Sequence, residues 1–144
     1  TSLLPGIYYG DVMIGICSDE VNLSTGDTIQ NDLVERAKGM VIFCDNGKVQ
    51  IDTNNRQDYL NTIISQGDTI GTAFDLDNGT IEFYRNGVSM GLVDMSASAV
   101  MNTTVVPFFS SYYPESTGYA VNFGQQPWKY TPPAGFRGIC HTTA

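Results

Sequence analysis

Two reactive side chains, Cys140 and His141, stand next to each other near the C-terminus. A thiol beside an imidazole can carry acyl transfer, and His141 is also the single histidine that could serve a nucleophilic serine. Adjacent residues of an extended chain point in opposite directions, however, and a Thr-rich terminal segment is a poor place for a catalytic base. We therefore expect no nucleophilic catalysis, and we predict that the chain is not an enzyme.

An acidic turn, Asp75-Leu76-Asp77-Asn78-Gly79, is a second candidate for chemistry. Its carboxylates superficially resemble a calcium loop, but an EF-hand loop needs about twelve residues with a terminal Glu. Here a strand-like segment begins directly at Thr80. Glycoside hydrolysis by Asp75 and Glu82 would require the two carboxylates to face each other across a cleft, whereas ordinary pairing beside Tyr84 on a strand explains Glu82. We expect no metal and no cofactor.

Recognition by aromatic side chains is the remaining chemistry. Tyrosine offers rigid, amphipathic contact area and is favoured at binding hot spots. The candidate binding residues near predicted loops are Tyr8, Tyr9, Arg56, Tyr59, Tyr112 and Tyr113. The pair before Pro114 is the strongest loop candidate. The alternative is that half or more of the tyrosines close the ends of the fold, and that Arg56 is a solvated surface residue.

The elements that must position these side chains are strands. Three apolar runs between Gly67 and Gly91 are separated by the turns Asp77-Asn78-Gly79 and Arg85-Asn86-Gly87. Asn-Gly between alternating hydrophobic segments indicates a tight hairpin, because both central residues need positive φ. The pattern predicts a three-stranded meander. The residues expected to be almost fully buried are Ile70, Phe74, Ile81, Phe83 and Phe123.

Further strands are expected before and after this meander. Their predicted ranges are residues 10–18, 39–44, 48–52, 104–112 and 119–124. The second and third form a hairpin around Asp45-Asn46-Gly47, and Pro107 predicts an edge strand or a bulge. Short strands with turn signals between them are typical of an all-β antiparallel sandwich.

Composition limits the partners. The 144 residues carry a net charge of −8, and only 15% of them are charged, against roughly 25% in an average domain. Nucleic acids and anionic membranes require a basic surface, so we expect neither nucleic-acid binding nor membrane insertion. The three cysteines, Cys17, Cys44 and Cys140, are an odd number at wide spacing and do not form a disulfide framework, and we expect Cys17 and Cys44 to be small buried hydrophobes.

Two segments carry a resemblance to a known family. GDTIGTAFDLDNGTIEFYRNGVSMG, residues 67–91, resembles the signature segment of the SPRY domain, the shared part of the B30.2 family. VNFGQQPWKYTPPAGFRG, residues 121–138, resembles the closing strand and tail of that family, and the order of Ile14-Gly15-Ile16 and Pro107 agrees. The tail resembles SPRY modules of bacteriophage structural proteins more than those of animal ubiquitin ligases.

The resemblance implies a single domain over residues 1–144 with a bent antiparallel β-sandwich, a jelly roll of the concanavalin-lectin-like type. It also implies that Phe123 and Trp128 pack on the core. SPRY domains are non-catalytic modules that bind proteins or peptides through loops at one end of the sandwich. We therefore expect a binding or scaffolding module, exposed on a phage virion or tail and part of a larger homo-oligomeric assembly. The alternative is a lectin-like module for host attachment, with a glycan on Tyr112, Tyr113 and Glu115.

The family usually has an aromatic-rich first strand that this chain lacks. We therefore expect the 144 residues to be a segment of a longer polypeptide. A missing strand would leave an unpaired edge of N–H and C=O groups at the Ile14-Gly15-Ile16 strand, which invites association, and would uncover apolar side chains around Val12 and Ile14.

Overall fold

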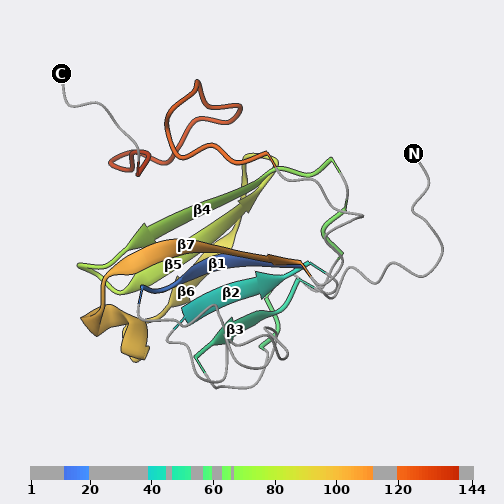
Figure 1. Ribbon diagram of the computed structural model, residues 1–144. Coiled ribbons are helices and arrows are strands. Elements are labelled where there is room, and N and C mark those ends of the chain that lie inside the picture. Colours follow the sequence, from blue (N-terminus) through green and yellow to red (C-terminus); the bar gives the residue numbers. More distant parts are fainter. Residues whose placement is uncertain are drawn as a thin grey trace.

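The computed structural model describes residues 12–19, 39–44, 47–52, 57–59, 63–65, 67–111 and 120–139 (Figure 1). These residues form strands and one short 3-10 helix. The elements are β1 (Val12–Ser18), β2 (Gly39–Phe43), β3 (Val49–Ile51), β4 (Ile70–Asp75), β5 (Thr80–Arg85), β6 (Val88–Asp94), η2 (Ala99–Asn102) and β7 (Val105–Ser111). The described residues contain no helix long and apolar enough to cross a membrane.

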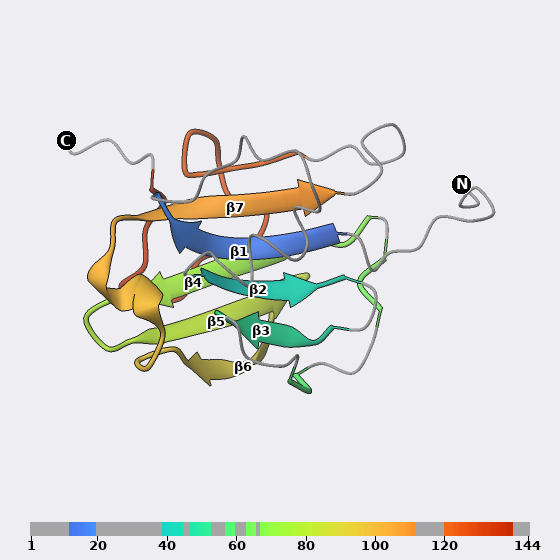
Figure 2. The same cartoon turned by 60° about the horizontal axis from the view of Figure 1, so that its bottom comes forward.

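The strands form two antiparallel sheets. One has the order β3-β2-β1-β7 and the other the order β4-β5-β6. Figure 2 shows them as two layers, with the four-stranded sheet in front of the three-stranded one. The all-β antiparallel sandwich expected from the hairpin signals is confirmed, as are the meander and the hairpin of β2 and β3.

The main core lies between the layers because alternate residues of each strand face the other sheet. Ile16 and Ile42 contribute from the four-stranded sheet, and Ile81 and Phe83 from the other. The buried cluster contains Ile16, Met40, Ile42, Cys44, Val49, Ile64, Ile81, Phe83, Met95 and Val100. A second buried cluster, formed by the alternate residues Met13, Cys17, Val41 and Phe108, occupies the opposite face of the four-stranded sheet. Cys17 and Cys44 are both buried, as expected.

Three of the five residues expected to be fully buried are not. Ile81 and Phe83 have no exposed surface, but Ile70, Phe74 and Phe123 are only partly buried. Ile70 and Phe74 do point toward the core, but β4 is an edge strand, so the sandwich covers them from fewer sides. Trp128 was expected on the core and is 42% exposed, so that assignment was wrong.

The two turns of the meander differ. Asn86 and Gly87 have φ of 52° and 82°, the pair of positive values required by the tight two-residue hairpin. In the other turn Gly79 has positive φ but Asp77 and Asn78 do not, so the positive φ predicted for Asn78 by the Asn-Gly signal was wrong. Instead the Asp75 carboxylate accepts bonds from the backbone N–H groups of both residues, at 3.0 and 3.1 Å, and these bonds hold the turn.

The edges of the four-stranded sheet also differ in part from expectation. Strand β1 pairs with β2 on one side and with β7 on the other, so the unpaired edge predicted at the Ile14-Gly15-Ile16 strand is not present there. Strand β7 lies at the end of the strand order, which confirms the prediction from Pro107. Among the described residues, the segment 120–124 forms no strand, so the last predicted strand was wrong over these residues.

Candidate binding surface

Five of the six predicted binding residues, Tyr8, Tyr9, Arg56, Tyr112 and Tyr113, lie outside the described residues. For these residues the binding role remains a prediction. Tyr59 is described and is partly buried, in the connection between β3 and β4.

Tyr59 is held at an irregularity of the three-stranded sheet. Glu82 pairs with Leu92 and Tyr84 with Ser89, so Phe83 alone faces two residues of β6. Such a bulge leaves ladder groups without partners. The Tyr59 hydroxyl bonds to one backbone group on each of the two strands. It accepts a bond from the Phe83 N–H on β5 at 3.3 Å and donates to the Gly91 carbonyl on β6.

The environment of Tyr59 also changes its titration. Burial, the largest effect, raises the pKa of Tyr59, the bond from the Phe83 N–H lowers it in part, and the charge of Glu82 adds to the rise. The ring packs edge-on against Phe83, with centroids 6.0 Å apart and an interplanar angle of 73°. These contacts show that Tyr59 stabilises the sheet. Its predicted binding role remains untested.

Asp68 fastens the tight Asn86-Gly87 turn to the segment before β4. Its carboxylate pairs with the Arg85 guanidinium at 2.6 Å and accepts bonds from the Asn86 amide and the Ser65 N–H, both at 2.8 Å. Burial alone would raise the pKa of Asp68, but these hydrogen bonds and the charge of Arg85 outweigh it and lower the pKa below 3.8. Asp68 is therefore a structural carboxylate.

Asp52 joins the β2–β3 hairpin to η2. Its carboxylate accepts bonds from the Gly39 N–H at 3.0 Å, the Ser98 hydroxyl at 2.8 Å and the Ala99 N–H at 2.9 Å. Asp52 itself has a φ of 50°, a conformation that few residues other than Gly, Asn and Asp adopt readily. It connects segments 13 and 47 residues apart in the sequence.

The turn carboxylates Asp75 and Asp94 follow the same pattern. Bonds from the Asn78 side chain and backbone lower the pKa of Asp75, and bonds from Ser96 lower the pKa of Asp94. No three His, Cys, Asp or Glu side chains of the described ranges are grouped so that they could hold a metal ion. These carboxylates therefore stabilise turns.

Glu82 lies on the outer face of the three-stranded sheet. It accepts bonds from the Tyr84 hydroxyl at 2.8 Å and from the Ser89 hydroxyl. Burial raises the pKa of Tyr84, and the bond to Glu82 and the charge of Glu82 raise it further. The three side chains bind one another across β5 and β6, as ordinary pairing on a strand face predicts.

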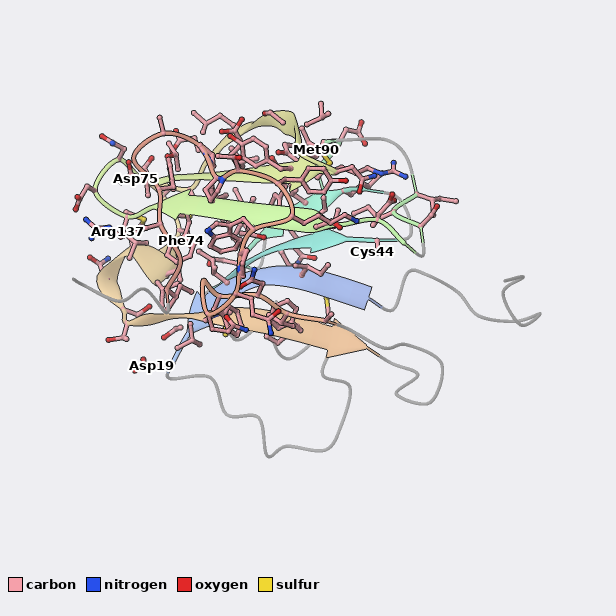
Figure 3. All side chains as sticks on the ribbon, turned by 90° about the horizontal axis from the view of Figure 1, so that it is seen from above. Asp19, Cys44, Phe74, Asp75, Met90 and Arg137 are labelled. Atoms are coloured by element: carbon pink, nitrogen blue, oxygen red, sulfur yellow. The ribbon has the colours of Figure 1, made fainter. Side chains whose placement is uncertain are left out.

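A different kind of surface is formed by residues 120–139, called the tail here. In Figures 1 and 3 the tail covers the side of the sandwich where the edge strands β4 and β7 lie. The centroid of the Phe123 ring lies 6.3 Å from the centroid of the Phe109 ring on β7, and the Lys129 ammonium lies 3.4 Å from the hydroxyl of Thr69 before β4.

Side-chain amides shape the start of the tail. Asn122 accepts a bond from the Gly124 N–H at 2.9 Å and donates to the Gln126 and Pro127 carbonyls. Gln125 accepts a bond from the Phe123 N–H at 2.6 Å. Several backbone polar groups therefore find partners within the segment, which lessens the need of residues 120–124 for a neighbouring strand.

Large apolar side chains remain exposed on this tail. Trp128, Tyr130 and Phe136 are 42%, 37% and 39% exposed, and Lys129 and Arg137 are exposed too. We call the five side chains of Trp128, Lys129, Tyr130, Phe136 and Arg137 the tail surface. Aromatic residues and Arg are enriched in protein interfaces. This surface was not predicted from the sequence, because Trp128 and Phe123 were expected to pack on the core. The absence of acidic residues in the tail was the available signal.

Comparison with known proteins agrees with the fold. The model of the SPRY domain family matches residues 8–126. The chain is similar to a protein named ATP-dependent RNA helicase DDX1 from Xenopus laevis, with 31% identity over 83 residues, 58% of this chain and 11% of the relative. It is also similar to ATP-dependent RNA helicase Ddx1 from Drosophila melanogaster, with 30% identity over 89 residues, 61% of this chain and 12% of the relative. No solved structure matches the chain significantly.

Proposed function

Because the chain belongs to the SPRY domain family, whose members are protein-interaction modules, we propose that it is a non-catalytic module that binds a protein or peptide partner. The observation that carries the proposal is the tail surface, where three aromatic side chains between 37% and 42% exposed stand beside two exposed basic residues. These side chains are not part of the buried core between the sheets, so they are available to a partner.

The described carboxylates support a non-catalytic role. Asp52, Asp68 and Asp75 each accept bonds from backbone N–H groups of turns or of η2, and Glu82 is occupied by two hydroxyl groups. General acid–base catalysis needs a positioned group within reach of a substrate proton. Side chains that hold the fold together in this way are poorly suited to that task.

Selection from a displayed peptide library tests the proposal. The expected result is a set of peptides that bind the folded chain saturably and compete with one another. A matched selection on the Phe83→Ala variant at a denaturant concentration that unfolds it controls for nonspecific capture. Absence of any peptide or protein that binds the folded chain in preference to the unfolded variant would reject the proposal.

The proposal does not include helicase activity. The two relatives are named ATP-dependent RNA helicases, but the matched segments make up 11% and 12% of them, and the chain therefore spans about a tenth of their length. The predicted place on a phage virion remains our proposal with no support from these relatives. Electron microscopy of virions labelled with antibody to this chain would test it.

The glycan alternative also remains a proposal, since Tyr112, Tyr113 and Glu115 lie outside the described residues. A glycan array separates the two classes of partner. Saturable sugar binding that is lost in Tyr112→Ala would favour a lectin-like module. A silent array together with peptide binding would favour a protein partner.

A further inference from the structure

We infer that the tail surface binds an acidic, extended peptide segment that also carries apolar side chains. The inference rests on the proposed function, because it names the chemistry of the partner and the place where it binds. The charge of the chain is unevenly distributed. The chain has a net charge of −8, yet residues 120–139 contain two of its seven basic residues and no Asp or Glu.

No carboxylate of the residues that the structure describes neutralises these two positive charges. Lys129 contacts the Thr69 hydroxyl and the face of the Tyr130 ring, and neither Lys129 nor Arg137 forms an ion pair with any carboxylate of the described ranges. Lys48 and Arg85, by contrast, pair with Asp58 and Asp68. Carboxylates from a partner would therefore find two cations at this surface that no described carboxylate pairs with.

The tail is anchored in place. The Lys129 ammonium lies 3.4 Å from the Thr69 hydroxyl before β4 and, within the tail, 5.5 Å from the centroid of the Tyr130 ring, in the range of a cation–π contact. A Cβ on Gly87 would stand 2.7 Å from the Tyr130 ring, so the ring lies directly on the tight turn. A Cβ on Gly138 would stand 2.3 Å from the Phe123 carbonyl oxygen, so the end of the tail folds back against its beginning.

Anchoring makes the surface suitable for recognition. A surface that is positioned before binding loses less conformational freedom when the partner arrives. Figure 3 shows Arg137 toward the end of the sandwich where Asp75 lies. The tail therefore presents its exposed side chains along the side of the sandwich that it covers.

A short peptide fits this surface better than a nucleic acid does. Both could place negative charge on Lys129 and Arg137 and flat groups on Trp128. A nucleic acid, however, brings a dense row of phosphates toward a chain whose net charge is −8, and its affinity depends on neutralising several of them. A peptide with a few carboxylates interleaved with leucine or phenylalanine meets the two cations and the aromatic side chains without that repulsion.

The chain carries its own reporter for the test. Trp128 is its single tryptophan and is 42% exposed. The probe is a short synthetic peptide in which Glu and Asp alternate with Leu and Phe, labelled with fluorescein and followed by anisotropy. Emission from Trp128 is measured in parallel with unlabelled peptide. We expect saturable binding, a blue shift of the emission and weaker affinity at higher salt. The same peptide with Lys in place of the acidic residues should not bind.

Charge-neutral variants locate the contact. Lys129→Gln and Arg137→Gln should each weaken binding about two- to five-fold, in keeping with exposed ion pairs, and the double variant should weaken it further. Lys48→Gln is the matched control, since it changes the net charge equally on the β2–β3 hairpin. Thermal unfolding of each variant verifies that it is folded.

The outcomes distinguish the proposed binding function from the inferred binding site and partner chemistry. Anisotropy that reports binding without a change in Trp128 emission, or an equal loss of affinity in all three single variants, would overturn the tail surface as the site and leave the binding function intact. Stronger binding of a single-stranded oligouridine than of the acidic peptide, with competition between them, would also overturn it. Should the acidic peptide fail to bind while peptides selected from the library bind elsewhere, the inferred chemistry is wrong.

Discussion

Replacing Tyr59 with Phe removes a single oxygen atom and tests whether this tyrosine stabilises the sheet or serves a partner. The hydroxyl accepts a bond from the Phe83 N–H and donates to the Gly91 carbonyl across the bulge between β5 and β6. Phenylalanine keeps the edge-on packing against Phe83. The substitution therefore isolates the contribution of the hydroxyl.

The expected cost follows from the burial of the two groups left behind. Phe83 has no exposed surface, so its N–H would lose its partner without access to water, whereas Gly91 is exposed and its carbonyl can bind water instead. An unsatisfied buried donor costs about 1–3 kcal/mol. The bond from Phe83 is long, at 3.3 Å, so the lower half of that range, about 1–2 kcal/mol, is expected.

Urea unfolding followed by circular dichroism measures this cost. Tyr59→Phe should lower the unfolding midpoint with an unchanged m-value, because the surface exposed on unfolding is the same. Tyr130→Phe is the control: Tyr130 is 37% exposed, and its substitution should change stability by no more than about 0.5 kcal/mol. An unchanged midpoint in Tyr59→Phe combined with loss of partner binding would refute the structural explanation and favour the binding role.

The titration of Tyr59 adds a second readout. Burial raises its pKa above 10.0 in the folded chain. A raised pKa gives stability that is complete below the unfolded value and is lost as pH rises through the folded value. The wild-type chain should therefore lose stability above about pH 10, and Tyr59→Phe should lose less. Equal loss in both would show that Tyr84, whose pKa is also raised, carries the effect.

Three further outcomes are expected. The pKa of Asp68 is lowered in the folded chain, so its stabilising effect is complete above pH 3.8 and is lost as the pH falls through the folded-state pKa. Asp68→Asn should therefore show a flatter dependence of the urea midpoint on pH below pH 3.8 than the wild type. Phe83→Ala should cost roughly 3–5 kcal/mol in calorimetry or urea unfolding, as aromatic truncations in cores do, and a cost typical of the surface would show that this face is not the core. Asp52→Asn should cost about 1–2 kcal/mol, because an amide nitrogen cannot accept the Ala99 N–H bond; a midpoint equal to that of the wild type would mean that this carboxylate does not hold η2.

The strands of the fold were predictable where local signals agreed. Asn86-Gly87 specifies a tight turn through its two positive φ values, and the alternation around Ile81 and Phe83 places both on the core face. A tight turn and an alternating strand are determined by neighbouring residues, so the residues themselves contain the information. The hairpin of β2 and β3 was predictable for the same reason.

The extent of burial was not predictable, and neither were hydrogen bonds between residues far apart in the sequence. Phe74 follows the same alternation as Phe83 but is only partly buried, because β4 lies at the edge of its sheet. No local pattern tells an edge strand from a central one. Asp52 reaches Ala99 over 47 residues, and nothing near either residue announces that contact.

The tail shows a different limit of sequence reasoning. Val121 and Phe123 alternate as strand residues do, and a strand was the natural expectation. The amide side chains of Asn122 and Gln125 bond to the nearby backbone instead, which removes the need for a partner strand. Once the segment is not a strand, the aromatic residues after it no longer have to face the core.

The polar side chains at the turns already bond to the fold, whereas Trp128 and Arg137 of the tail form no such bond to the residues that the structure describes, and this difference is why we place partner binding on the tail. At the turns of the sandwich, Asp52, Asp68 and Asp75 direct their carboxylates to backbone groups of the fold. A side chain already occupied in this way gives little to a partner, since the partner must first displace an existing bond. Trp128 and Arg137 have no such task within the described ranges, and both are exposed. Replacing either should therefore leave stability nearly unchanged while weakening the peptide contact, which is the opposite of the pattern expected for Tyr59.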